Sequence, residues 1–123
     1  VHFPITTFAK KENTTIMGFT KMLAHTLEQN KLSKTFKALG HPARIAILQY
    51  ISNNPDCICN DMVRDIDLAQ ATISQHLVEL KKVDLIIGKH IGKKTCYSIN
   101  IDKLYEVKQS VGSFFNETQQ GAM

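Results

Sequence analysis

The apolar residues in the middle of this chain change their spacing from a helical period to a strand period, and this change limits the fold more than any other feature. Two helices are predicted first, separated only by the turn Asp67-Leu68. The first has apolar residues four positions apart, namely Ile58, Met62 and Ile66. The second, over residues 70–82, has a buried face formed by Ile73, Leu77 and Leu80. Two short helices joined by so brief a turn form a helix-turn-helix pattern.

Residues 85–99 then follow the two-residue period of β-strands. We expect one strand over residues 85–87 and a second over residues 95–99. The turn between them is expected at residues 90–94, where Gly92 can adopt a positive φ. The predicted fold class is therefore mainly α with a small β-hairpin (α+β), in the arrangement known as a winged helix-turn-helix.

Further helices are predicted on both sides of this central segment. An amphipathic helix near residues 19–27 precedes a short helix that Gly40 ends, and Pro42 suits the first turn of the next helix. That next helix is expected to bury Ile45, Leu48 and Ile51, with Ala46 and Ile47 widening the apolar stripe. After the hairpin, Asp102 is expected to cap a C-terminal helix.

The length of 123 residues is enough for one domain with one modest core. We expect residues 1–15 to form a flexible arm, residues 16–118 to form the domain with its terminal helices, and residues 119–123 to fray. No apolar run approaches the roughly 18 residues that a membrane-spanning helix needs. The three cysteines make a poor disulfide framework, and the chain does not open with a secretory signal pattern. These features favour a cytoplasmic protein with reduced thiols.

Positive charge is concentrated in one segment of the chain. The formal net charge is +4, and residues 81–94 carry five lysines against Asp84 alone. A local excess of this kind, directly after a helix-turn-helix, is the expected footprint of a polyanion such as DNA. The candidate DNA-binding residues are Gln70, Thr72, Ser74, Gln75, His76, Lys81, Lys82, Lys89, Lys93 and Lys94.

These candidates have different expected roles. Gln75 has the amide that pairs with adenine, and Thr72 offers a methyl group to thymine or a hydroxyl to phosphate. Lys81 and Lys82 are expected to contact phosphates. The hairpin, with Lys89, Lys93 and Lys94, is expected to reach the flanking backbone or the minor groove as a wing. His76 borders the buried face and suits packing better than base contact. A solvated surface helix has the same polar stripe, so the prediction depends on the order of the elements together with the charge.

Two segments resemble the ArsR-type (arsenical-resistance repressor) family of winged helix-turn-helix regulators. Residues 68–77 (LAQATISQHL), followed by Leu80-Lys81 and Leu85-Ile86, are similar to the recognition helix of that family. Residues 36–48 (FKALGHPARIAIL) are similar to its second signature. The resemblance covers about residues 31–100. It implies a homodimer that binds double-stranded operator DNA, with the terminal helices at the dimer interface and release when an effector binds.

The apolar terminal helices are consistent with such an interface, because a core this small leaves part of their surface to meet a partner. The candidate interface residues are Phe19, Leu23, Leu27, Leu104, Val107, Val111, Phe114 and Phe115.

Cys57 and Cys59 are candidate metal ligands, because Asp56–Asp61 resembles the Cys-x-Cys sensor motif of the family. Positions i and i+2 of a regular helix point about 200° apart. A shared ion therefore requires Cys57 to precede the helix and Cys59 to lie near its first turn. Met62 stands where arsenic sensors often have a third cysteine, and Cys96 is an uncertain third ligand. No cofactor is required, and the candidate effector is As(III) or another thiophilic metal ion.

Other functions stay open at this stage. Cys57 and Cys59 also suit packing residues or a redox-responsive pair, which would make the chain a thiol-redox regulator. A winged helix can also serve as a protein-interaction module. An enzyme is not expected, since the six glycines form no phosphate loop and no nucleophile elbow is present.

Overall fold

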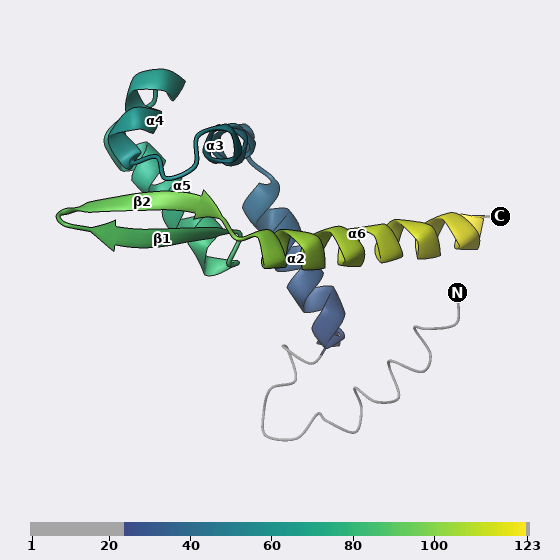
Figure 1. The fold of residues 1–123 in the computed structure, drawn as a ribbon. Coiled ribbons are helices and arrows are strands. Elements are labelled where there is room, and N and C mark those ends of the chain that lie inside the picture. The colour runs from purple at the N-terminus through teal and green to yellow at the C-terminus, as the bar shows by residue number, and fades with distance from the viewer. Residues whose placement is uncertain (1–23, 123) are drawn as a thin grey trace. The chain divides into compact units, whose positions relative to one another are not determined.

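The structure is a computed structural model of the chain, and it describes residues 24–122, with side chains from 24 to 121. The elements in chain order are α2 (Leu27–Leu39), α3 (Pro42–Asn53), α4 (Cys59–Ile66), α5 (Gln70–Lys82), β1 (Ile86–Ile91), β2 (Lys94–Ile99) and α6 (Ile101–Ala122) (Figure 1). The chain divides into two compact units. Residues 35–106 form one, and within the described range residues 24–34 and 107–122 belong to the other. None of the helices within the described range is long and apolar enough to cross a membrane.

The predicted helix-turn-helix is formed by α4 and α5 in the unit of residues 35–106. Helix α4 ends at Ile66, and Asp67 adopts a left-handed conformation with φ of 62°, from which its N–H donates to the Val63 carbonyl. Aspartate tolerates this conformation better than most residues, so it ends the helix sharply. Helix α5 begins at Gln70, as predicted.

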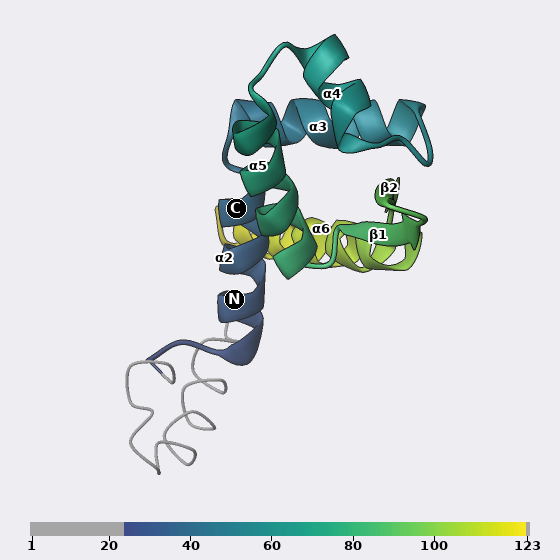
Figure 2. The same cartoon turned by 90° about the vertical axis from the view of Figure 1, so that its left-hand side faces the viewer.

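The core of this unit lies where α3 packs on α4, α5 and β2, and where α5 also packs on β1. Figure 2 shows α5 crossing α3 steeply. The fully buried large side chains come from each of these helices and from the start of the hairpin: Ile47, Ile51, Met62, Ile73, Leu80 and Leu85. The predicted apolar face of α5 is therefore confirmed.

One part of the predicted core is wrong. Ile45 is 41% exposed, whereas Ile47 and Ile51 are buried and Leu48 is half-buried. Four apolar residues in succession leave the helical phase undetermined in the sequence, and the packing partners of α3 decide it. The start of α3 agrees with the prediction, because Pro42 occupies the first turn and His41 Nδ1 accepts a hydrogen bond from the N–H of Ala43.

The hairpin is longer than expected. Strands β1 and β2 are antiparallel with Ile91 opposite Lys94, so only Gly92 and Lys93 remain in the loop. Gly92 has φ of +62°, which a two-residue hairpin loop of this kind requires of its first residue. The prediction assigned residues 90–94 to the turn because an exposed two-stranded ribbon with polar residues on both faces shows no alternation.

Helix α2 begins with a reciprocal cap. The Thr26 N–H donates to Gln29 Oε1, and the Gln29 N–H donates to Thr26 Oγ1, both at 3.0 Å. One helix therefore covers the predicted short helix and Leu27. The rest of the helix predicted near residues 19–27 falls almost wholly outside the described residues, as does the predicted arm 1–15.

Helix α6 corrects two predictions. Its cap is Asn100, whose Oδ1 accepts a hydrogen bond from the Lys103 N–H at 3.3 Å, and Asp102 lies in the first turn instead. An acidic residue in the first turn is favourable because of the helix dipole. The helix also continues through residues 119–122, which were expected to fray. Glutamine is a good helix former, so Gln119 and Gln120 carry the helix on.

Candidate nucleic-acid interface

The polar face of α5 is the first part of the candidate interface. Gln70, Thr72, Ser74 and Gln75 are all exposed, on the side of α5 away from the core. Gln75 Nε2 donates to Glu79 Oε2 at 3.4 Å, and Lys82 Nζ lies 3.0 Å from the same oxygen. The hydrogen bond from Lys82 lowers the pKa of Glu79, so this carboxylate is charged and holds both neighbours along the helix surface.

His76 does not belong to this face. It is only 7% exposed, and its Nδ1 accepts a hydrogen bond from Arg44 Nε at 3.1 Å. Its ring centroid also lies 4.5 Å from that of His41. Burial lowers the pKa of His76, and the charges of His41 and Arg44 lower it further. The ring is a neutral packing group, because position 76 stands three residues after Ile73 and four before Leu80 on the buried stripe.

The basic residues form the second part of the interface. Lys81, Lys89, Lys93 and Lys94 are exposed, and among residues 24–121 none of them forms an ion pair. Lys82 differs, because Glu79 already pairs with it. Lysines without a protein partner are free to replace the counterions of a phosphate backbone. The hairpin and the end of α5 therefore present a basic surface beside the polar face of α5.

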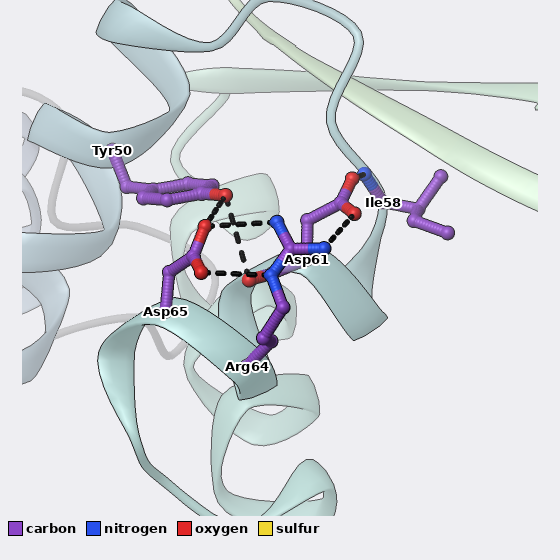
Figure 3. A network of polar contacts seen from close by, with 5 residues as sticks. All are labelled: Tyr50, Ile58, Asp61, Arg64 and Asp65. Carbon is purple, nitrogen blue, oxygen red and sulfur yellow. Dashed lines mark hydrogen bonds and ion pairs between the residues drawn. The ribbon is translucent and has the colours of Figure 1, made fainter.

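A network that the sequence did not reveal connects α4 to α3 (Figure 3). Tyr50 donates from its hydroxyl to Asp65 Oδ2 at 2.6 Å. Arg64 donates to both oxygens of the same carboxylate, at 2.8 and 2.9 Å. Arg64 and then Tyr50 hold the pKa of Asp65 well below its usual range. Arg64 and Asp65 are neighbours in the sequence, so their pairing could be predicted from it. The contact with Tyr50 on α3 could not. The network therefore joins α4 to α3 through exposed polar side chains.

The two candidate thiols have the backbone arrangement that a shared ligand requires. Cys57 precedes α4 in a segment that pairs with β2, since the Tyr97 N–H donates to the Cys57 carbonyl at 2.8 Å. Ile58 is extended, with φ of −108° and ψ of 167°, and Cys59 is the first residue of α4.

The surroundings of the three cysteines differ. Cys57 is 5% exposed, and burial, followed by the charge of Asp61, raises the pKa of its thiol to about 11. Cys59 is half-buried, and its Sγ lies 3.8 Å from Ser74 Oγ on α5. Cys96, the uncertain third ligand, is half-buried on β2. Across residues 24–121, no group of three His, Cys, Asp or Glu side chains is arranged to hold a metal ion.

The candidate dimer residues on the terminal helices expose apolar surface. Leu27 is 77% exposed and Phe115 is 57% exposed. Along α6, Leu104 and Phe114 are also exposed, and Val107 and Val111 are half-buried. Phe19 and Leu23 lie outside the described residues. Leu104, Val107, Val111 and Phe114 lie three or four residues apart on α6, the spacing of one helix face.

Comparison with known proteins identifies the family and the fold. The sequence profile described as "Bacterial regulatory protein, arsR family" matches residues 41–87. An arsenical resistance operon repressor of Staphylococcus xylosus is 28% identical over 95 residues, which cover 77% of this chain and 89% of that protein. An uncharacterized HTH-type transcriptional regulator of Methanocaldococcus jannaschii is 33% identical over 78 residues, covering 63% and 86%. The fold is similar to that of an ArsR-like transcriptional regulator from Rhodococcus sp. RHA1, with a TM-score of 0.67, 18% identity and coverage of 76% and 88%.

Proposed function

This chain belongs to the ArsR family of bacterial regulatory proteins, and on that premise we propose that it binds operator DNA as a homodimer and represses transcription. The helix α5 enters the major groove in this proposal, with Gln70, Thr72, Ser74 and Gln75 toward the bases. The hairpin lies along the neighbouring backbone.

One observation carries the proposal: an exposed polar helix face adjoins a basic hairpin whose lysines are unpaired within the described range. A surface helix alone would have the polar face, and a solvated loop alone would have the lysines. Their combination on consecutive elements matches what a duplex presents, namely base edges in a groove and phosphates beside it.

The homodimer is proposed because two copies are needed to read a two-fold symmetric operator. A dimer presents two recognition helices to half-sites about 34 Å apart along the DNA. The exposed apolar side chains of α6 are the surface we assign to this contact, with Leu27 on α2.

Fluorescence anisotropy tests the proposal, using reduced protein and duplex DNA from the region upstream of its own gene. We expect tight binding that weakens steeply with salt. The variant Lys93→Ala with Lys94→Ala should bind all DNA more weakly, with a salt slope reduced by about 0.9 for each lost phosphate contact. A matched variant, Lys37→Ala with Lys108→Ala, loses the same charge elsewhere and should keep the slope. Equal slopes for the two double variants would exclude the hairpin from the interface.

A thiophilic metal or metalloid effector is a second proposal, and it rests on the position of Cys57 just before α4 and Cys59 at its start. Two thiolates can hold As(III) when the arsenic keeps a third ligand that does not come from the protein. A strain at the start of α4 would be passed to α5 through the short turn between them. The buried Cys57 thiol gives up its proton on binding, and with As(III) a hydroxide that leaves the arsenic takes this proton as water.

The effector proposal is tested by adding arsenite in excess reductant to the DNA complex. We expect release of DNA from the unaltered protein and none from Cys57→Ser with Cys59→Ser. Cys96→Ser is the matched control and should release DNA normally. Release by peroxide without any metal, and none by arsenite, would instead favour a thiol-redox regulator.

A further inference from the structure

A small pocket lies between the start of α4 and the hairpin, within the unit of residues 35–106. Its volume is about 210 Å³. One wall is formed by Cys59 and Asn60, and the opposite wall by Lys93, Lys94 and Thr95. The pocket therefore brings two lysines predicted to bind DNA together with Cys59, a combination that the sequence did not predict.

The donors around this pocket suit an anion. Lys93 and Lys94 form no ion pair among the described residues. Cys59 and Asn60 supply the first two N–H groups of α4, which have no carbonyl partner in a helix. The nearby carboxylate of Asp61 is already engaged, since it accepts from the Ile58 N–H at 3.0 Å and lies 3.6 Å from Arg64 Nη1. Two lysines and free amides without a free carboxylate favour a phosphate over a cation.

The pocket also adjoins the polar face of α5. Cys59 Sγ lies 3.8 Å from Ser74 Oγ, and Ser74 is one of the residues proposed to face the bases. The Cys59 thiol therefore connects three elements of the candidate interface, namely the start of α4, the face of α5 and the hairpin. Cys57 is buried behind this surface, and Cys96 does not line the pocket.

We propose that this pocket seats one backbone phosphate of bound DNA against the Cys59 thiol, so that DNA and a covalent adduct on Cys59 exclude each other. This inference rests on the proposed function and deepens it. It assigns Cys59 a direct effect on DNA binding by occlusion, separate from any effect transmitted through α4 from a metal held with Cys57.

The proposal is tested by measuring whether bound DNA protects the Cys59 thiol from alkylation. In the variant Cys57→Ser with Cys96→Ser, Cys59 is the single thiol, and its rate of alkylation by iodoacetamide is followed by mass spectrometry. A short duplex of unrelated sequence at low salt is the probe, because phosphate contacts do not depend on sequence. At a DNA concentration ten times the Kd, mass action predicts alkylation about tenfold slower. The variant Cys57→Ser with Cys59→Ser leaves only Cys96, which should be protected far less.

Two results distinguish a failure of the phosphate seat from a failure of the proposed function. If anisotropy shows bound DNA and Cys59 still reacts at its free rate, the phosphate seat is wrong and the proposed function stands. If no duplex binds at any salt concentration, the proposed function and the seat fail together.

A charge placed in the pocket gives an independent measurement. Cys59→Glu and Cys59→Gln are similar in size, so their difference in DNA affinity reports charge alone. We expect Cys59→Glu to bind about tenfold more weakly than Cys59→Gln, the loss of one charge-assisted contact. The difference should shrink as salt is added. Ser52→Glu adds a carboxylate on α3 outside the pocket and should stay close to the unaltered protein. Equal affinities for the two Cys59 variants would overturn the seat.

Discussion

Arg44 Nε donates a hydrogen bond to His76 Nδ1 at 3.1 Å, which joins the first turn of α3 to the middle of the proposed recognition helix α5. The same guanidinium donates from Nη1 to the Ala38 carbonyl near the end of α2, at 3.3 Å. His41 completes the cluster, since it caps α3 with one nitrogen and stacks its tilted ring near His76. One arginine thus connects three helices of the unit of residues 35–106, the DNA-binding unit.

Replacing this arginine should destabilise the fold. Arg44→Met keeps much of the aliphatic side chain but leaves the buried Nδ1 of His76 without a donor. We expect the free energy of unfolding to fall by about 1–3 kcal/mol, the cost of an unsatisfied buried polar group. Urea denaturation followed by circular dichroism measures it. Lys37→Met, on the exposed surface of α2, is the control and should change stability little.

Stability should also depend on pH through His76. Its pKa in the folded protein lies below the ordinary value of 6.5, so the unfolded chain binds more protons in this range. The free energy of unfolding is therefore fully retained above about pH 6.5 and falls as the pH drops below it. The titratable and charged groups that act on His76 are His41 and Arg44, and Arg44 also acts on Glu79. Because the pKa values of Glu79 and Asp65 are also lowered, their contributions are lost only below their ordinary values of 4.5 and 3.8.

Urea denaturation between pH 5 and pH 8, with His76→Gln as the comparison, checks this dependence. The amide of the replacement side chain keeps an oxygen that accepts from Arg44 and does not titrate. A His76→Gln variant with the same loss of stability below pH 6.5 would show that another group is responsible.

Sequence preference should reside in the polar face of α5. Gln75→Ala should change the ranking of operator variants, with each disrupted base contact worth about 1–3 kcal/mol, because a bidentate amide is lost from the groove. Competition binding against a set of single-base operator variants measures the ranking. An unchanged ranking, with binding merely weaker at every site, would move Gln75 from the bases to the backbone.

The apolar surface of α6 should control assembly. Val111→Asp with Phe115→Asp places two charges on that surface, and we expect the dimer to dissociate and operator affinity to fall with it. Sedimentation equilibrium measures the mass, and anisotropy measures DNA binding in the same buffer. Ser110→Asp with Ser113→Asp adds the same charge to the same helix and is the matched control. Dissociation caused equally by both variants would argue against a defined interface at Val111 and Phe115.

The core of the DNA-binding unit should be sensitive to a cavity in α5. Leu80 is fully buried, so Leu80→Ala is expected to lower the free energy of unfolding by about 2–5 kcal/mol. Val78 is 46% exposed on the same helix, and Val78→Ala should cost far less. Thermal and urea unfolding of both variants check the difference, and similar losses would mean that the burial of α5 is misassigned.

Much of the DNA-binding unit is predictable because its signals are local. The boundaries of α5, the turn at Asp67 and the glycine of the hairpin loop depend on residues that are neighbours in the chain. Cys57 lies before α4, as a metal ion shared with Cys59 would require, but the sequence does not show that such an ion binds. The phase of α3 was not predictable in this way, because a run of apolar residues offers more than one buried face and only the packing partners choose between Ile45 and Ile47.

The order of the elements, the helix-turn-helix and the concentration of lysine in the hairpin can be read from the sequence, since each is a property of short segments. Which side chains contact one another depends on the folded chain. In the folded chain, Arg44 forms a hydrogen bond with His76, which is 32 positions away in the sequence. His76 is buried and so is not part of the interface, and Cys59 lines the same pocket as the hairpin lysines. Those contacts depend on packing between helices and strands far apart in the chain, and packing is a property of the whole fold that no local pattern records.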